Sequence, residues 1–211
     1  MKKLIALLLF AAMLLACAAG SAVGCAKPEP EIIIDHTNHA ADNTEQEKEP
    51  TPVDSLYFLP QDFALGFGEL MIEFTVEKDG SFSGTFRDPR PNETGKDYPN
   101  GVMHLADFEG RFTDFKQINY YTYSMTLAEL TLEREVGEEW IEGGVKYYAN
   151  DAFGLAGGTE FFLYTEDALR EKLPEPFLGW APADYVTEPD TLTYYGIYNP
   201  DNQMGFFTYD F

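Results

Sequence analysis

Residues 70–86 decide the fold and read Leu-Met-Ile-Glu-Phe-Thr-Val-Glu-Lys-Asp-Gly-Ser-Phe-Ser-Gly-Thr-Phe. Every second residue from Leu70 to Val76 is apolar, which is the period of a strand with one buried face. Asp79 and Gly80 then predict a tight turn, because glycine adopts a positive φ without a steric penalty. The chain returns with the same alternation. This stretch therefore predicts an antiparallel β-hairpin with one aliphatic face in the core.

A short pattern in this hairpin recurs further along the chain. Residues 82–86 read Phe-Ser-Gly-Thr-Phe, and residues 108–112 read Phe-Glu-Gly-Arg-Phe. On a strand, the two phenylalanines of each copy face the same side as the central glycine. A glycine inside a strand marks a bend or a close approach of another backbone, and curved sheets use such kinks. The repeat therefore predicts a sheet that curls toward closure.

Strand patterns continue to the end of the chain. The alternation of residues 121–127 predicts a strand that Leu130 and Leu132 extend past a bulge. Residues 199–202, Asn-Pro-Asp-Asn, predict the turn of a final hairpin. The other expected strands cover residues 145–148, 160–164, 193–198 and 204–209.

Helix is expected only once. Residues 165–172 predict a short helix that Thr165 caps and that Pro174 and Pro176 stop. Aromatic residues make up 15% of the chain, with 17 Phe and 13 Tyr, and such rings pack well on pleated sheets. We therefore predict an all-β fold, a curved antiparallel meander that forms a barrel or a sandwich. A lipocalin-like barrel fits the length and the hairpins, although the Gly-x-Trp signature of that family is absent.

The N-terminus has the pattern of an export signal. Lys2 and Lys3 precede an apolar run from Leu4 to Ala16, and small residues then lead to Cys25. The apolar run is shorter than the about 20 residues that a membrane-spanning helix needs. The run therefore predicts a secretory signal in place of a permanent span.

Two cysteines stand where a lipid anchor would be attached. Residues 14–17, Leu-Leu-Ala-Cys, and residues 22–25, Ala-Val-Gly-Cys, resemble the lipobox of bacterial lipoproteins, here of the Gram-positive type. The resemblance implies a protein held by lipid on the outer face of the cell membrane, and it transfers no activity and no functional residue. We favour Cys25 as the anchor, with Cys17 as the alternative and an ordinary secretory signal also open.

The chain divides into three expected parts. Residues 1–24 are the signal peptide, residues 25–55 a disordered acidic tether, and residues 56–211 a single β-rich domain. The tether has prolines, many acids and few large apolar groups, so it buries too little surface to fold. No cysteine follows Cys25, so the domain is expected to be stable without disulfides.

Charge narrows the choice of partners. The chain has 36 acidic and 14 basic residues, with a formal net charge of −22. Such a surface repels phosphate backbones, so nucleic acid is not an expected partner. The expected partners are the membrane, through the N-terminal lipid, and a glycan, a small molecule or an envelope protein.

The sequence shows no catalytic motif. His104 is the only histidine of the predicted domain, and it alternates with apolar neighbours as an ordinary strand residue does. We therefore predict no enzyme, no cofactor and no metal site.

Aromatic side chains are the best binding candidates. Adjacent residues on a strand face opposite sides, so paired tyrosines place some rings outside the core, and rings beside carboxylates suit sugars or amphipathic ligands. We predict a binding module for a small molecule or a glycan. An envelope interaction domain and a secreted glycoside-type hydrolase are the alternatives. The predicted ligand-binding residues are Tyr121, Tyr148, Tyr195, Trp140 and Trp180.

Overall fold

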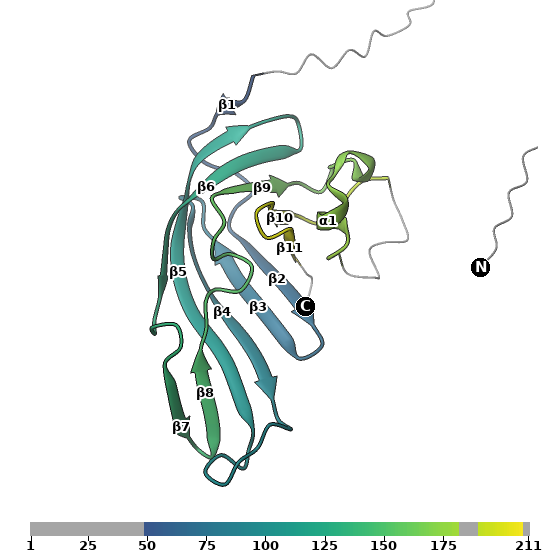
Figure 1. The fold of residues 1–211 in the computed structure, drawn as a ribbon. Coiled ribbons are helices and arrows are strands. Elements are labelled where there is room, and N and C mark those ends of the chain that lie inside the picture. The colour runs from purple at the N-terminus through teal and green to yellow at the C-terminus, as the bar shows by residue number, and fades with distance from the viewer. Residues whose placement is uncertain (1–48, 182–189, 209–211) are drawn as a thin grey trace, which may run out of the picture. The chain divides into compact units, whose positions relative to one another are not determined.

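The computed structural model describes residues 49–181 and 190–208. Both cysteines and the predicted signal lie outside the described residues. The described chain is almost entirely β-structure (Figure 1). Among the described residues, no helix has the length and apolar character needed to cross a membrane. The strands are β1 (Thr51–Pro52), β2 (Gln61–Phe67), β3 (Leu70–Val76), β4 (Ser81–Arg90), β5 (Val102–Gln117), β6 (Thr122–Leu132), β7 (Glu139–Glu142), β8 (Val145–Ala149), β9 (Glu160–Tyr164), β10 (Gly196–Asn199) and β11 (Met204–Thr208).

Eight of these strands close into an antiparallel barrel. The order around the barrel is β2-β3-β4-β5-β6-β9-β10-β11, which is the order along the chain with β7 and β8 left out. The barrel closes where β11 pairs with β2, through Phe207 opposite Ala64 and Thr208 opposite Phe63. The predicted curved antiparallel meander is confirmed, and its barrel form is consistent with a lipocalin-like fold.

The two glycine-centred repeats face each other across β4 and β5. Phe82 pairs with Gly110, and Gly84 pairs with Phe108. A Cβ atom on Gly84 would lie 2.8 Å from Cζ of Phe108 and would also collide with Cβ of Phe74. Each glycine therefore makes room for a phenylalanine of the neighbouring strand, which explains the repeat.

Phenylalanine rings fill the barrel. Phe82 and Phe112 lie 4.7 Å apart between ring centroids, and the rings of Phe74 and Phe206 meet edge to face at 5.2 Å. Leu56 precedes β2 and is buried at one end of the barrel. The interior is therefore a packed core. Its buried phenylalanines are Phe63, Phe74, Phe82, Phe86, Phe108, Phe112, Phe115, Phe161 and Phe206.

The described chain is paired before the predicted start of the domain. Strand β1 pairs antiparallel with the end of β5, and the backbone N–H of Val53 donates to the carbonyl of Phe115.

The bulge predicted in β6 is also present. Arg111 pairs with Glu129 while Phe112 pairs with Leu127, so Ala128 is the extra residue of β6.

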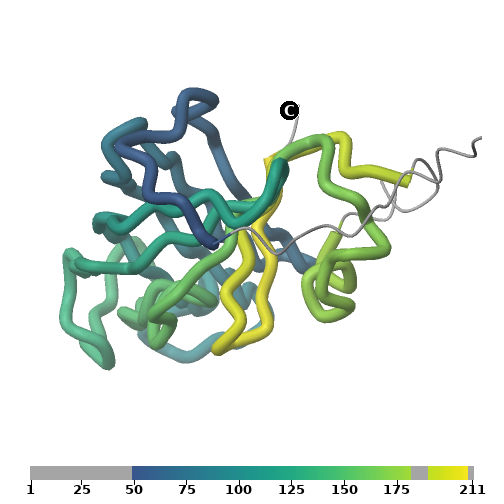
Figure 2. The backbone as a smooth tube through the Cα atoms, turned by 90° about the horizontal axis from the view of Figure 1, so that it is seen from above, coloured from purple at the N-terminus to yellow at the C-terminus, as the bar shows by residue number. Residues whose placement is uncertain are grey.

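A second, smaller core lies outside the barrel. Residues 165–181 and 190–195 pack against the outer face of β9, β10 and β11, with Phe177 at the centre. Figure 2 shows this segment beside the yellow strands β10 and β11, on the side away from β7 and β8. The ring of Phe177 lies 4.9 Å from Tyr164 and 5.0 Å from Phe207. These two segments therefore cover an apolar outer face of β9, β10 and β11 that would otherwise be exposed to solvent.

The predicted helix over residues 165–172 is wrong in position. Only the 3₁₀ turn η1 (Arg170–Lys172) forms there, and the α-helix α1 (Glu175–Leu178) begins after Pro174. Leu169 forms an isolated bridge with Thr191, so pairing between distant segments overrides the local helix preference. Proline in the first helical turn has no N–H that needs a partner, so it begins α1 where we expected it to end a helix.

An open sheet extends the barrel at its other side (Figure 1). Strand β8 pairs parallel with the first residues of β5, and β7 pairs antiparallel with β8. Together with the end of β4, these strands form a part of the sheet that does not close. Strands β2 and β7 were not expected from the sequence.

Candidate functional site

The predicted ligand-binding aromatic residues lie at separate places in the structure. Trp140 and Tyr148 are on the β7–β8 hairpin, but Trp140 pairs with Tyr147 and so faces the side opposite to Tyr148. Tyr121 and Tyr195 lie beside the starts of β6 and β10. Trp180 follows α1, and its indole N–H donates to the carbonyl of Gln203 at 2.7 Å. The five residues therefore do not form one cleft.

The hairpin rings are covered by neighbours. Trp140 stacks on Tyr147 with ring centroids 5.0 Å apart, and the guanidinium of Arg134 lies 4.2 Å from the indole centroid. Tyr148 stacks on His104 at 4.9 Å, and the ammonium of Lys146 lies 4.4 Å from its ring. These rings stabilise the open sheet and offer few free faces to a ligand.

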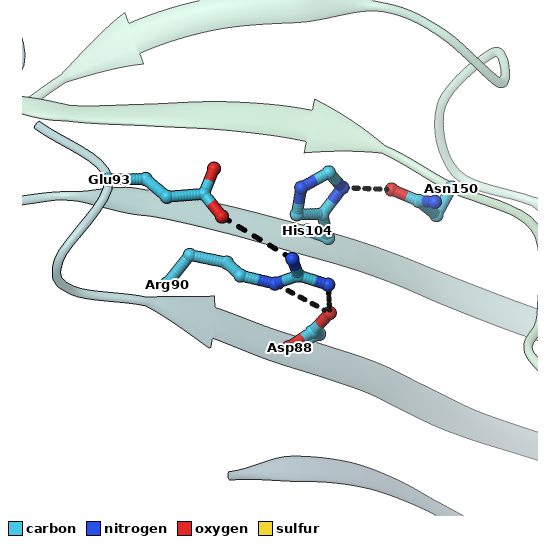
Figure 3. A network of polar contacts seen from close by, with 5 residues as sticks. All are labelled: Asp88, Arg90, Glu93, His104 and Asn150. Atoms are coloured by element: carbon cyan, nitrogen blue, oxygen red, sulfur yellow. Dashed lines mark hydrogen bonds and ion pairs between the residues drawn. The ribbon is translucent and has the colours of Figure 1, made fainter.

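Charged groups on the open sheet are also paired (Figure 3). Arg90 donates to Oδ2 of Asp88 at 2.7 Å and to Glu93 at 3.3 Å, and the hydrogen bond to Asp88 raises the pKa of Arg90. His104 Nδ1 lies 3.1 Å from Oδ1 of Asn150. His104 lies in β5, as expected for a strand residue, and this contact joins it to Asn150, the residue directly after β8.

Lys146 belongs to the same face of the open sheet. Its ammonium lies 2.8 Å from a carboxylate oxygen of Glu139, and this hydrogen bond is the main cause that raises the pKa of Lys146. Each basic group here has an acidic neighbour on an adjacent strand or loop. The network is therefore organised to hold the sheet together.

Two hollows lie on the outer face of the barrel. Their volumes are about 330 and 350 Å³, and both are lined by Ser83. The hydroxyl of Thr75 donates to Asp62 at 2.5 Å in one of them. None of the five predicted aromatic residues lines either hollow. Their other polar side chains are Asp62, Glu73, Thr75 and Thr85 in one, and Asp107, Glu109, Thr131 and Glu133 in the other.

A cluster of rings, here named the tyrosine end, lies where the chain enters the barrel. Its contacting rings are Tyr57, Phe58, Tyr123 and Tyr195. Tyr120 is included because its phenol lies near enough to Tyr123 to act on it electrostatically. Phe58 is the base: it stacks on Tyr195 at 5.1 Å and meets Tyr123 and Tyr57 edge to face at 5.5 and 5.2 Å. Three segments distant in sequence therefore contribute to one aromatic surface.

The outer rings of the tyrosine end are exposed. Tyr57 is 83% and Tyr120 75% exposed, whereas Tyr123 is only 7% exposed. Burial, followed by the nearby phenols of Tyr57 and Tyr120, raises the pKa of Tyr123. Burial also raises the pKa of Tyr195, and Glu166 adds to this effect. The tyrosine end therefore combines a fixed base with two freely accessible rings.

Sequence reasoning found Tyr195 but missed Tyr57. Tyr57 comes just before the first strand of the barrel, where no alternation marks a binding surface. The available signal was the adjacent aromatic pair Tyr57 and Phe58 followed by Pro60. One ring of such a pair is exposed when the other enters the core.

Comparisons with known proteins found no match to this chain. No protein-family model matches the sequence, and neither the curated proteins nor the solved structures give a match. Among the described residues, no group of three or more His, Cys, Asp or Glu side chains is arranged to hold a metal ion. The ring geometry and its charged neighbours are therefore the features of this chain that bear on its function.

Proposed function

We propose that this protein is an exported lipoprotein whose barrel binds a glycan or an amphipathic small molecule at the tyrosine end. The observation that carries the proposal is the exposure of Tyr57 and Tyr120, at 83% and 75%, above a packed base of rings. Tyrosine offers a flat apolar face and a polar hydroxyl, and its ordering costs little side-chain entropy. These are the properties that stacking on a sugar ring requires.

Packing supports a site outside the barrel. The interior is filled by phenylalanine rings in mutual contact, such as Phe82 and Phe112 at 4.7 Å. A ligand in the interior would have to displace these rings and lose their burial energy. The tyrosine end needs no such displacement, because its outer rings already face solvent.

The N-terminal pattern supports the proposed location. The basic start, the apolar run and Cys25 suit export and lipid attachment. Two acyl chains on one cysteine would hold the protein on the outer face of the membrane. The proposed tether then joins the barrel next to Tyr57, so the binding surface lies at the anchored end of the domain.

Membrane attachment is tested by Cys25→Ala in the intact chain, expressed in a Gram-positive host. We expect this variant to be secreted or retained without lipid, and Cys17→Ala to be lipidated as in the wild type. The measurement is mass spectrometry of the mature N-terminus together with detergent partitioning. Lipid on Cys17, or a free mature N-terminus in the wild type, would contradict the proposed anchor.

Ligand binding is tested by calorimetric titration with defined glycans. The probes are tetramers of N-acetylglucosamine, of glucosamine and of glucose, all β-1,4-linked, together with purified cell-wall fragments. We expect at least one probe to bind the wild-type protein, and the double variant Tyr57→Ala/Tyr120→Ala to lose at least tenfold in affinity. Truncating an aromatic residue that dominates a contact surface costs about 2 kcal/mol or more, and about 1.4 kcal/mol corresponds to a tenfold change in affinity.

The control for this titration is Ser83→Trp, which places a large side chain in both outer hollows. We expect it to bind as the wild type does. Binding that persists in the tyrosine variant but disappears in Ser83→Trp would move the site to the hollows. Failure of every probe to bind the wild-type protein would reject the proposed glycan-binding function.

A further inference from the structure

We infer that the tyrosine end selects a glycan that carries a positively charged amino group, an inference that rests on the proposed binding at that end. The selectivity for an amino group comes from two carboxylates, Glu166 and Asp167, which a turn holds beside Tyr195. Both carboxylates are exposed. A stacking surface alone would accept neutral sugars, so these two groups are what gives the site its selectivity.

Backbone pairing fixes the turn next to the rings. Tyr164, the last residue of β9, pairs with Gly196 of β10 and with Thr122 of β6. The next residue, Thr165, donates its N–H to the carbonyl of Tyr121 at 3.0 Å. Tyr195 precedes Gly196 on the neighbouring strand, so it lies level with Thr165. The residues that follow Thr165 are therefore brought to the rim of the tyrosine end.

The turn itself is closed and anchored. The N–H of Ala168 donates to the carbonyl of Thr165 at 3.0 Å, and the N–H of Leu192 donates to the carbonyl of Ala168 at 2.9 Å. Ala168 is fully buried in the outer core. Glu166 and Asp167 are therefore presented by a short segment that is tied at both ends, and ordering them on a ligand costs little backbone entropy.

Electrostatics agree with the backbone geometry. After burial, the carboxylate of Glu166 is the next cause that raises the pKa of Tyr195, and Asp167 also contributes. Both carboxylates therefore lie near enough to the phenol of Tyr195 for their charges to act on it. An ammonium group placed over a tyrosine face gains from the ring quadrupole, and adjacent carboxylates add a direct charge interaction.

The ligand class follows from this combination. Among the described residues, no set of three or more metal-binding side chains is present to hold an inorganic cation. Flat aromatic rings with carboxylates at the rim suit an organic cation carried on a ring that has an apolar face. A glucosamine unit has both features, whereas N-acetylglucosamine has the same ring without the charge.

The test compares two sugars that differ at this amino group, which is free and charged in glucosamine and acetylated and neutral in N-acetylglucosamine. Calorimetric titrations of the intact mature protein use the glucosamine tetramer and the N-acetylglucosamine tetramer, at a mildly acidic pH where the amines are protonated. We expect the glucosamine tetramer to bind about tenfold more tightly, the scale of one cation–π contact with a nearby carboxylate. Glu166→Gln/Asp167→Asn is expected to remove this preference and to leave the affinity for N-acetylglucosamine unchanged.

A matched control separates this site from general attraction to an acidic protein. Asp62→Asn/Glu73→Gln removes the same charge from an outer hollow, and we expect it to keep the tenfold preference. Loss of the preference in both double variants, or only in the hollow variant, would overturn the inference. Equal binding of the two sugars would also overturn the inference, while leaving the proposed function in place. If neither sugar binds but the glucose tetramer or the wall fragments do, the inferred amino-sugar class is wrong and the proposed glycan binding still stands.

Discussion

Phe112 inside the barrel is fully buried and packs 4.7 Å from Phe82, whereas Tyr57 at the tyrosine end is 83% exposed and contacts Phe58 at 5.2 Å. Both rings belong to aromatic clusters of similar centroid spacing. They differ in what surrounds them: apolar core side chains, the rings of Phe82 and Phe161 among them, for Phe112, and solvent on the outer side for Tyr57. Phe112 has no hydroxyl group, whereas Tyr57 has one.

This difference separates the two tasks of the aromatic residues. Interior phenylalanines remove apolar surface from water and so stabilise the fold. Their tight packing leaves no tolerance for added volume, as the glycines opposite them indicate. The exposed tyrosines contribute little to that burial. A residue that adds little to stability yet exposes a large ring is a candidate for binding.

Substitution of Gly84 tests the packing of the interior directly. In Gly84→Ala the new methyl group would meet Cβ of Phe74 and would lie 2.8 Å from Cζ of Phe108. Overpacking of this kind costs about 1–3 kcal/mol, and we expect the free energy of unfolding to fall by that amount. Urea denaturation followed by far-UV circular dichroism measures it.

The matched control is Gly179→Ala. Gly179 follows α1 with φ −64°, and a methyl group there would meet carbonyl oxygens at 3.5 Å, which is ordinary contact distance. We expect a change of no more than about 0.5 kcal/mol, as at surface sites. An unfolding free energy of Gly84→Ala equal to that of this control would show that the glycine repeat is not required by packing.

Tyr164 allows a further test of the difference between buried and exposed rings, because it is a tyrosine that is buried in the outer core. The expected effect on stability is smaller than that of Gly84→Ala. Burial raises the pKa of Tyr164 above the ordinary value of 10.0. Below about pH 10 the phenol is neutral in both states, and as pH rises further the unfolded state loses its proton first. The folded protein therefore loses stability progressively above pH 10. We expect Tyr164→Phe to lose less, measured as thermal midpoints from pH 8 to pH 11.

The slope of that pH profile is the informative quantity. Other tyrosines with raised pKa values, such as Tyr198, also contribute to the alkaline loss. Tyr164→Phe should therefore reduce the slope and not abolish it. Identical slopes for the variant and the wild type above pH 10 would contradict the assigned effect of burial on Tyr164.

Most of the barrel was predictable because its signals are local. The hairpin of residues 70–86, the glycine repeat and the bulge before Leu130 each depend on neighbours within one or two strands. The position of the helix was not predictable, since the bridge between Leu169 and Thr191 joins segments far apart in sequence. Strand β7 escaped prediction although the Gly143–Gly144 turn, with positive φ at both glycines, joins it to the predicted strand β8. The parallel pairing of β8 with β5 has no local pattern.

The candidate site was less predictable than the fold. Alternation indicated that one ring of the pair Tyr194 and Tyr195 would leave the core, but no pattern could show that Arg134 and Tyr147 cover the ring of Trp140. The tyrosine end brings together a segment before β2, the turn before β6 and the start of β10. Their proximity depends on closure of the barrel, and no local pattern encodes it.

The most direct test of the account is to measure the stability and the glycan binding of Tyr57→Ala/Tyr120→Ala in the same preparation. We predict an unfolding free energy within about 1 kcal/mol of the wild type, as expected for exposed side chains, together with at least a tenfold loss of affinity for the glycan that binds the wild type. A variant that is destabilised as strongly as Gly84→Ala, or that binds the glycan unchanged, would contradict the separation between rings that build the barrel and rings that bind.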